Sequence, residues 1–257
     1  MKQPVDIQQI LTQTSNLNLA ERVLARVRYE LKNSIEPYPM LYLPLARLSP
    51  IVRDAKRAVM VGRDTQLTLE AFQGSGNTYA LGLFKHLDLS IAHHSHAAAQ
   101  VIASVRRNIP TLIIVREPDE AVLSFIARVK VLTLEQALRE YSNFHHHILP
   151  YKDGIVVTNF SEFLQDPAQT VARLDRKFGT DFSSGLEVKH ESAAENVKSW
   201  HKFNKAGSVH ESDVPLPSEV RSERKELLRE YLHSSSAQRH LERANEMYQV
   251  FAALSDN

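Results

Sequence analysis

Apolar residues recur at four-residue steps in the segment 17–33, which places them on one side of a helix. They are Leu19, Val23, Val27 and Leu31. The next segment, 35–50, contains four prolines, and proline restricts both its own backbone and that of the residue before it. The pattern therefore predicts an amphipathic helix followed by an irregular or extended connector.

From residue 57 the pattern changes to short apolar or alternating runs, which are typical of β-strands. The expected strands are 58–62, 67–72, 89–94, 111–117 and 154–160. The first two are joined by the polar turn 63–66, which favours a hairpin between them. Residues 112–115 are four consecutive apolar residues, the pattern of a parallel strand that is covered on both faces.

Helical patterns separate these strands, and the alternation predicts an α/β fold with a central, mostly parallel sheet flanked by helices. Helices are expected at 79–87, 96–108, 118–129, 134–147, 166–179, 218–233 and 236–254. We predict a single domain over 1–257. It would comprise the helical extension and connector (1–56), an α/β core (57–180), and a polar loop with C-terminal helices (181–257).

Composition narrows the function classes. The chain has 257 residues, of which 43% are hydrophobic, so it can bury a core. Lysine and arginine number 31 against 30 acidic residues, which argues against a chain-wide nucleic-acid surface but allows a local basic cleft. The absence of cysteine excludes disulfides, zinc–thiolate sites and a cysteine nucleophile. No apolar run approaches about 18 residues and the N-terminus is polar, so we expect no membrane span and a cytoplasmic location.

A glycine-containing turn lies between an expected strand and an expected helix. It consists of Gly74, Ser75, Gly76, Asn77 and Thr78. Glycines let the backbone approach an anion closely, and the N–H groups of a helix N-terminus favour negative charge. Two interpretations are open: a phosphate-binding loop, or a helix cap formed by Ser75 or Asn77. The turn lacks the lysine of a Walker A motif, and Tyr79 replaces the third glycine of the dinucleotide motif.

Arg116 follows the clearest strand, and Ser124 lies eight residues later in the next helix. Ligands of open α/β sheets bind outside the carboxyl ends of the strands, where an arginine can hold a phosphate through two hydrogen bonds. The alternative is that Arg116 only pairs with Glu117 or Asp119.

Taken together, these two motifs resemble those of the sulfotransferase family. The run FQGSGNTYALGLF is similar to the family's FPGSGNTWL form, and Arg116 and Ser124 match its second motif with the eight-residue spacing. The stretch from Val157 to Pro167, followed by a helix ending KFG, is similar to the family's strand–loop–DP–helix stretch. The resemblance covers residues 68–180.

The resemblance implies a P-loop NTPase-like topology and the transfer of a sulfuryl group from PAPS (3′-phosphoadenosine 5′-phosphosulfate). The acceptor would be a hydroxyl or amine on a small molecule or glycan, and no metal is implied. The glycine turn would hold the 5′-phosphosulfate, and Arg116 and Ser124 the 3′-phosphate. Many family members have a lysine where this chain has Gly74, which leaves open what assists the leaving group.

In that family a histidine after the second strand often acts as the base. Here His94 and His96 are the candidates, and alternation along a continuing strand would place them on one side, opposite His93. The family's late basic loop corresponds to Arg221, with Arg224 second. The run His145–His147 is expected to be a solvated helix end rather than a metal site. Alternative functions are a kinase with an atypical phosphate loop and a non-catalytic nucleotide-binding module.

Overall fold

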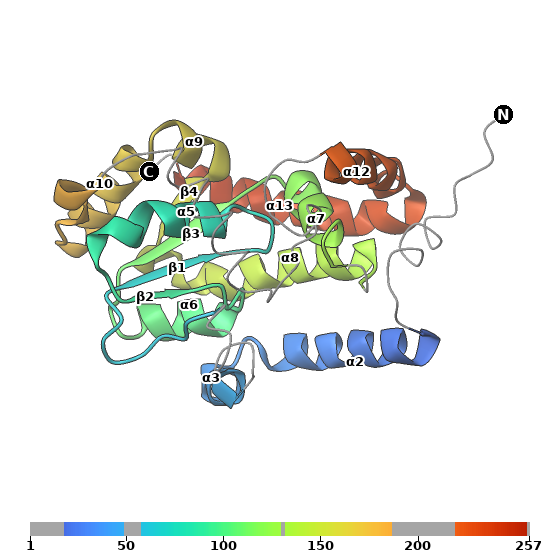
Figure 1. The fold of residues 1–257 in the computed structure, drawn as a ribbon, viewed down its shortest axis with the longest axis horizontal. Coiled ribbons are helices and arrows are strands. Elements are labelled where there is room, and N and C mark those ends of the chain that lie inside the picture. Colours follow the sequence, from blue (N-terminus) through green and yellow to red (C-terminus); the bar gives the residue numbers. More distant parts are fainter. Residues whose placement is uncertain (1–17, 49–57, 130–131, 187–218, 256–257) are drawn as a thin grey trace.

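The computed structural model describes residues 18–48, 58–129, 132–186 and 219–255. Its centre is a parallel sheet of four strands in the order β2-β1-β3-β4 (Figure 1). The strands are β1 (Leu67–Ala71), β2 (Ile91–His93), β3 (Thr111–Val115) and β4 (Val156–Asn159). Leu69 pairs with His93 on one side and with Leu112 on the other. The predicted α/β fold with a parallel sheet is confirmed.

Helices lie on both sides of the sheet, as the fold class requires. Between the strands and after them come α5 (Asn77–Phe84), α6 (Ala98–Val105), α7 (Pro118–Ile126), α8 (Leu134–Ile148), α9 (Phe160–Gln165) and α10 (Pro167–Phe178). The C-terminal helices are α12 (Glu219–Leu232) and α13 (Ser235–Ser255), and the N-terminal ones are α2 (Leu19–Ile35) and α3 (Pro39–Leu48). Short 3₁₀ helices cover Lys85–Leu87, Leu149–Gly154 and Phe182–Gly185.

Alternate residues of β3 feed two separate hydrophobic cores. Ile113 and Val115 pack with α6, α7, α8 and α13 on one face of the sheet. Leu112 and Ile114 pack with α5 and α10 on the other face. A strand buried on both faces shows no polar alternation, which explains the continuous apolar run in its sequence.

The predicted hairpin between 58–62 and 67–72 is wrong. Both edges of β1 are occupied by parallel neighbours, β2 and β3, so no edge remains for a third partner. Val59 instead forms a single antiparallel bridge with His93 at the outer edge of β2. The apolar pattern of the segment reflects burial of Met60 and Val61 against a third core cluster.

The predicted irregular connector is also wrong where it is described, because residues 39–48 form α3 despite their prolines. Pro39 occupies the first position of the helix, where a missing N–H costs nothing. Pro44 lies inside the helix, where proline is normally unfavourable. Burial of the neighbouring Tyr42 and Leu43 offsets this cost.

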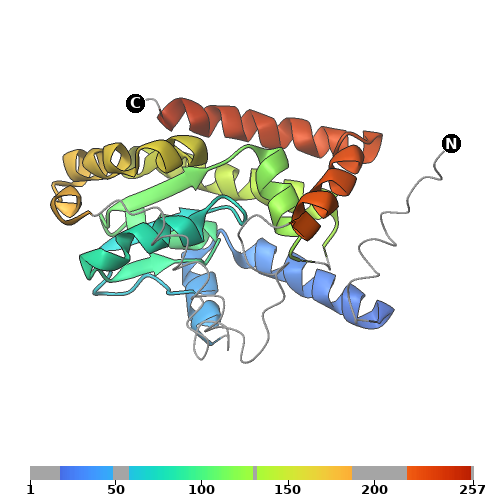
Figure 2. The same ribbon diagram turned by 45° about the horizontal axis from the view of Figure 1, so that its top comes forward.

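At the other end of the core, Gly179 ends α10 with φ at 68°, as predicted for a C-cap. The sequence did not distinguish α9, which begins directly after β4. In Figure 2, α13 runs across the top of the molecule and α2 lies along its lower margin. None of the helices in the described ranges combines the length and the hydrophobicity that a membrane span needs.

Candidate functional site

The glycine turn joins β1 to α5 at the carboxyl edge of the sheet. Gly74 and Gly76 both have positive φ, 93° and 96°, a region that side-chain-bearing residues rarely adopt. Gly76 is the N-cap of α5, and no side chain forms a cap hydrogen bond there. The N–H groups of the first turn of α5 therefore have no side-chain acceptor at the cap.

Ser75 and Asn77 are buried beside this turn, 1% and 4% exposed. Ser75 Oγ, Asn77 Oδ1 and Asn77 Nδ2 have no hydrogen-bond partner among the described residues. The alternative interpretation, that one of these side chains caps the helix, is therefore wrong. Buried polar atoms in native proteins usually have hydrogen-bond partners, so these three atoms beside the turn are available to a polar group.

Both glycines are also required by their neighbours in the fold. A Cβ at Gly74 would lie 2.3 Å from the Ala121 carbonyl oxygen, and a Cβ at Gly76 would lie 2.1 Å from Phe160 Cε2. The missing loop lysine is thus not a simple exchange, because this backbone has no room for a side chain at Gly74. Close packing against Ala121 of α7 and against Phe160 therefore fixes the backbone path of the turn.

We expect Gly76→Ala to lower the free energy of unfolding by more than Gly179→Ala. Both substitutions force alanine to a positive φ, which costs about 1–2 kcal/mol. Only Gly76 adds overlap with a ring, which costs about 1–3 kcal/mol more, since nothing lies within 4 Å of a Cβ at Gly179. Urea denaturation of both variants measures this difference. Equal losses would contradict the close packing of the turn on Phe160.

Arg116 follows β3 and connects three parts of the site. Its Nη1 donates a hydrogen bond to the Gly74 carbonyl oxygen at 2.9 Å, and its guanidinium lies 4.9 Å from the Phe160 ring centroid. Its Nη2 forms an ion pair with Glu120 at 3.3 Å. The acidic partner is thus Glu120 rather than the expected Glu117 or Asp119. Arg116 holds the glycine turn directly, which the sequence spacing alone did not indicate.

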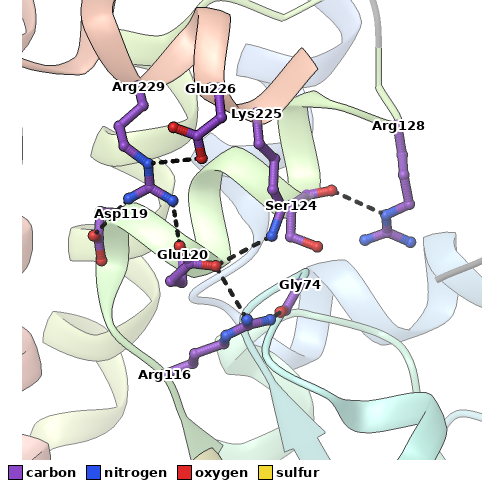
Figure 3. A network of polar contacts seen from close by, with 9 residues as sticks. All are labelled: Gly74, Arg116, Asp119, Glu120, Ser124, Arg128, Lys225, Glu226 and Arg229. Atoms are coloured by element: carbon purple, nitrogen blue, oxygen red, sulfur yellow. Dashed lines mark hydrogen bonds and ion pairs between the residues drawn. The ribbon is translucent and has the colours of Figure 1, made fainter. Parts of the chain in front are cut away.

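Glu120 is the centre of a charged network between α7 and α12 (Figure 3). Lys225 Nζ lies 3.2 Å from Glu120 Oε2, and Arg229 Nη2 lies 2.5 Å from Glu120 Oε1. Burial opposes ionisation of Glu120, but Arg229, Lys225 and Arg116 outweigh it and lower its pKa to about 2. Glu120 is therefore a carboxylate at neutral pH, surrounded by three cations.

Ser124 lies against the glycine turn, since a Cβ at Gly74 would come within 3.3 Å of Ser124 Cβ. Its carbonyl oxygen accepts a hydrogen bond from Arg128 Nε at 3.3 Å. The structure therefore brings together the turn, Arg116 and Ser124, as the sequence predicted. It adds Arg128, which follows the end of α7, and Lys225 from α12, neither of which the sequence pattern had singled out.

The predicted Arg221 lies in α12, but its side chain is outside the described part of the chain. Lys225 follows Arg221 by four residues and Arg229 follows by eight, so the three share one side of the helix. This spacing is the signal by which the sequence could have identified Lys225 and Arg229.

The histidine segment after β2 does not continue as a strand. His94 and His96 have φ values of 58° and 50°, so the expected alternation of side chains does not apply. His94 Nε2 lies 2.9 Å from Thr78 Oγ1, in the first turn of α5. His94 Nδ1 lies 2.8 Å from His93 Nδ1. The structure thus links His94 to the glycine turn through Thr78.

His96 points elsewhere. Its Nδ1 lies 2.8 Å from the Ala71 carbonyl oxygen, so Nδ1 carries the proton. Burial lowers the pKa of His96 to about 3 and that of His93 to about 4. Both are neutral and weakly basic at pH 7. His94 is therefore the better placed of the two predicted bases.

Glu70 is a buried carboxyl of β1 that shapes the same segment. It accepts hydrogen bonds from the Ser95 N–H at 2.9 Å, the His96 N–H at 3.0 Å and Gln100 Nε2 at 2.7 Å. Burial raises the pKa of Glu70 to about 8, although these hydrogen bonds oppose the shift. Glu70 anchors the backbone directly after His94 and was not singled out in the sequence.

The expectation that residues 145–147 form a solvated helix end is wrong for His145. This side chain is fully buried, and its Nδ1 donates to the Tyr141 carbonyl oxygen at 2.8 Å. Its ring contacts Tyr141, Phe144 and Phe251, so packing between α8 and α13 accounts for its position. In the ranges that the structure describes, no three His, Asp or Glu side chains form a group that could hold a metal ion.

Of the comparisons with known proteins, the comparison with solved structures gives a match. No family model matches the chain, and no curated protein does either. Among solved structures, the chain is similar to the mouse sulfotransferase SULT7A1 complexed with PAP. The two are 12% identical, the match covers 73% of this chain and 90% of that one, and the TM-score is 0.37.

Proposed function

We propose that this chain transfers a sulfuryl group from PAPS to a hydroxyl or amine acceptor. Two independent arguments support the proposal. The sequence motifs around Gly74 and Arg116 resemble those of sulfotransferases, and the fold places them at one edge of the sheet. The observation that carries the proposal is the set of unpartnered polar atoms on the buried Ser75 and Asn77.

The glycine turn suits the 5′ end of the nucleotide. The hydroxyl of Ser75 and the amide of Asn77 supply donors, and the helix N-terminus adds backbone N–H groups and a favourable dipole. Donors held in place before the reaction stabilise charge that develops on a leaving phosphate. In this proposal PAPS supplies the activated sulfuryl group, and the chain supplies binding, orientation and a place for the proton.

The second motif suits the 3′-phosphate. Arg116, Ser124 and Lys225 lie around one position beside the turn, and Arg116 and Lys225 are both cationic. Both cations already contact Glu120, so a phosphate would share them with this carboxylate. The affinity that this competition costs can be measured by replacing Glu120.

For the proton of the acceptor, His94 is the residue we assign as general base. Its ring nitrogens are engaged by Thr78 and His93, so Thr78 must exchange its contact for Nε2 to accept a proton from the acceptor. The low pKa of His96 makes it a weaker base for this task.

Thermal-shift titration tests the proposal. PAPS and adenosine 3′,5′-bisphosphate should each raise the melting temperature, and ATP with Mg²⁺ should not. Stabilisation by ATP–Mg²⁺ alone would instead favour the kinase alternative. Binding of PAPS without turnover, measured over a panel of hydroxyl and amine acceptors, would favour a non-catalytic nucleotide-binding module. Gly74, which stands where many sulfotransferases have a lysine, is consistent with such a module.

We expect Glu120→Gln to tighten the binding of adenosine 3′,5′-bisphosphate by about threefold to tenfold. The substitution removes a negative charge beside the proposed 3′-phosphate position and frees Arg116 and Lys225 from an ion pair. Isothermal titration calorimetry measures the change. Asp119→Asn is the matched control, because Asp119 pairs with Arg229 at 3.4 Å on the same helix. Weaker binding by Glu120→Gln would mean that Glu120 mainly orients Arg116.

A further inference from the structure

The helix α2 contacts the rest of the molecule through polar side chains together with Tyr29 and Ile35, which pack against two of the hydrophobic cores. Gln136 Nε2 donates to Glu30 Oε1 at 2.7 Å, and Arg139 of the same helix, α8, pairs with Glu30. Lys32 Nζ lies 3.8 Å from Glu140 Oε1, also in α8. None of the 17 residues of α2 is buried. Among the residues that the structure describes, this arrangement leaves the large apolar side chains of α2 exposed.

The helix α2 lies at the margin of the molecule (Figure 2). Five large apolar side chains of α2 are close to half exposed or more: Leu19 at 70%, Val23 at 51%, Leu24 at 49%, Val27 at 49% and Leu31 at 62%. Scattered single apolar residues are normal on a surface, but a continuous stripe along one helix marks an interaction site.

The spacing of the stripe identifies the kind of partner. Within the stripe, Leu24, Val27 and Leu31 follow one another by three and four residues. Ala20 and Ser34 extend this spacing at its two ends, and Leu19 and Val23 lie beside it. This repeat of 3.5 residues is the seam by which helices pair in coiled coils, narrower than the face of a helix that lies on a lipid surface. The seam therefore fits another helix of the same kind.

Charges beside the seam favour self-pairing in antiparallel orientation. With Leu24 opposite Val27 of a second copy, Glu21 lies opposite Arg28 of that copy, and the two-fold axis repeats this pair. A parallel pair would place Val23 beside Arg28 and gain no ion pair. Glu21 Oε2 accepts from the Asn18 N–H at the helix cap, and a carboxylate accepts further bonds.

We propose that two copies of this chain associate through α2, packed antiparallel along the seam Ala20–Leu24–Val27–Leu31. Anionic lipid is a poorer fit because Glu21 and Glu30 border the stripe, and because Lys32 is directed to Glu36 and Glu140 of its own chain. The association involves neither the glycine turn nor Arg116, so it is independent of the proposed function.

Light scattering after size exclusion tests the association at protein concentrations of 1–100 µM. The wild-type chain should show twice the 29.2 kDa of one copy. Leu24→Glu with Leu31→Glu should raise the dimer dissociation constant at least 100-fold without changing the melting temperature of the monomer. Val250→Glu is the matched control, because Val250 is 41% exposed on α13. A wild-type monomer throughout, or a dimer unaffected by the double variant, would overturn the proposal.

Cross-linking tests the orientation and does not depend on how the glutamate variants fold. The chain has no cysteine, so any disulfide-linked dimer must form through the single cysteine that is introduced. A mixture of Leu24→Cys and Val27→Cys should form a disulfide-linked dimer on mild oxidation, faster than Leu24→Cys alone. Faster linkage of Leu24→Cys alone would overturn the antiparallel arrangement. A monomer that binds phosphatidylserine vesicles, with binding lost in the Leu24→Glu and Leu31→Glu variant, would instead assign the stripe to membranes.

Discussion

Replacing Arg116 by alanine should weaken the binding of adenosine 3′,5′-bisphosphate by about 2–4 kcal/mol, or roughly 30- to 900-fold. The substitution removes the proposed charge-assisted phosphate contact. It also removes the hydrogen bond from Nη1 to the Gly74 carbonyl oxygen, which positions the turn. Both effects act in the same direction, which makes this the largest loss of binding that we expect from a single substitution at the site.

The two effects can be separated by ligand and by variant. A ligand without the 3′-phosphate, such as AMP, should lose much less affinity, because only the displaced turn affects it. Arg116→Lys keeps a charge but loses the fork of two donors, so it should recover part of the difference. If AMP and the bisphosphate lose affinity equally, the assignment of Arg116 to the 3′-phosphate is wrong.

Replacing His94 by alanine should lower turnover about 10²-fold or more while PAPS affinity stays nearly unchanged. General-base catalysis typically contributes about this much, and His94 is adjacent to Thr78 on the helix that follows the turn. Steady-state turnover with a productive acceptor, compared with the PAPS dissociation constant from calorimetry, measures the split between chemistry and binding.

Two further variants control for His94. His96→Ala should reduce turnover less, since the Nδ1–H of His96 is committed to the Ala71 carbonyl oxygen and its pKa is about 3. His146→Ala removes an exposed histidine of α8 and should have no effect. Full activity of both His94→Ala and His96→Ala would rule out a histidine base in this segment.

The sequence was sufficient where one physical rule governs a segment. Ligands of open α/β sheets bind at the carboxyl ends of the strands, and the resemblance to sulfotransferase motifs implied that the turn after β1 and Arg116 after β3 contact one nucleotide. The continuous apolar run of β3 likewise follows from burial on both faces. In the structure Arg116 reaches the turn and donates to Gly74.

The sequence was insufficient where tertiary packing overrides local preference. The prolines of α3 argue against a helix, but burial of Tyr42 and Leu43 outweighs them. His94 and His96 have positive φ in a segment whose Ser95 and His96 N–H groups donate to Glu70 and whose His96 ring bonds to Ala71. No local pattern reveals these bonds. Glu70 itself lies in an alternating run, which normally places a glutamate in solvent, but this sheet has no solvent face there.

The burial of carboxyl groups has a consequence for the proton balance of folding. Burial raises the pKa of Glu70 and that of Glu140 to about 8, from the usual 4.5. Between these values the unfolded chain has released protons that the folded chain retains. Folding at pH 7 is therefore coupled to the uptake of about one proton at each position.

A raised carboxyl pKa contributes stability that is fully present below about pH 4.5 and is lost as the pH rises through about 8. The unfolding enthalpy at pH 7 should therefore depend on the ionisation enthalpy of the buffer, with a slope equal to the number of protons released. Glu140→Gln should reduce this number by about one. An unchanged dependence would show that Glu140 is ionised in the fold. Through Glu70, the backbone that carries the proposed base is tied to a group that releases its proton when the domain opens.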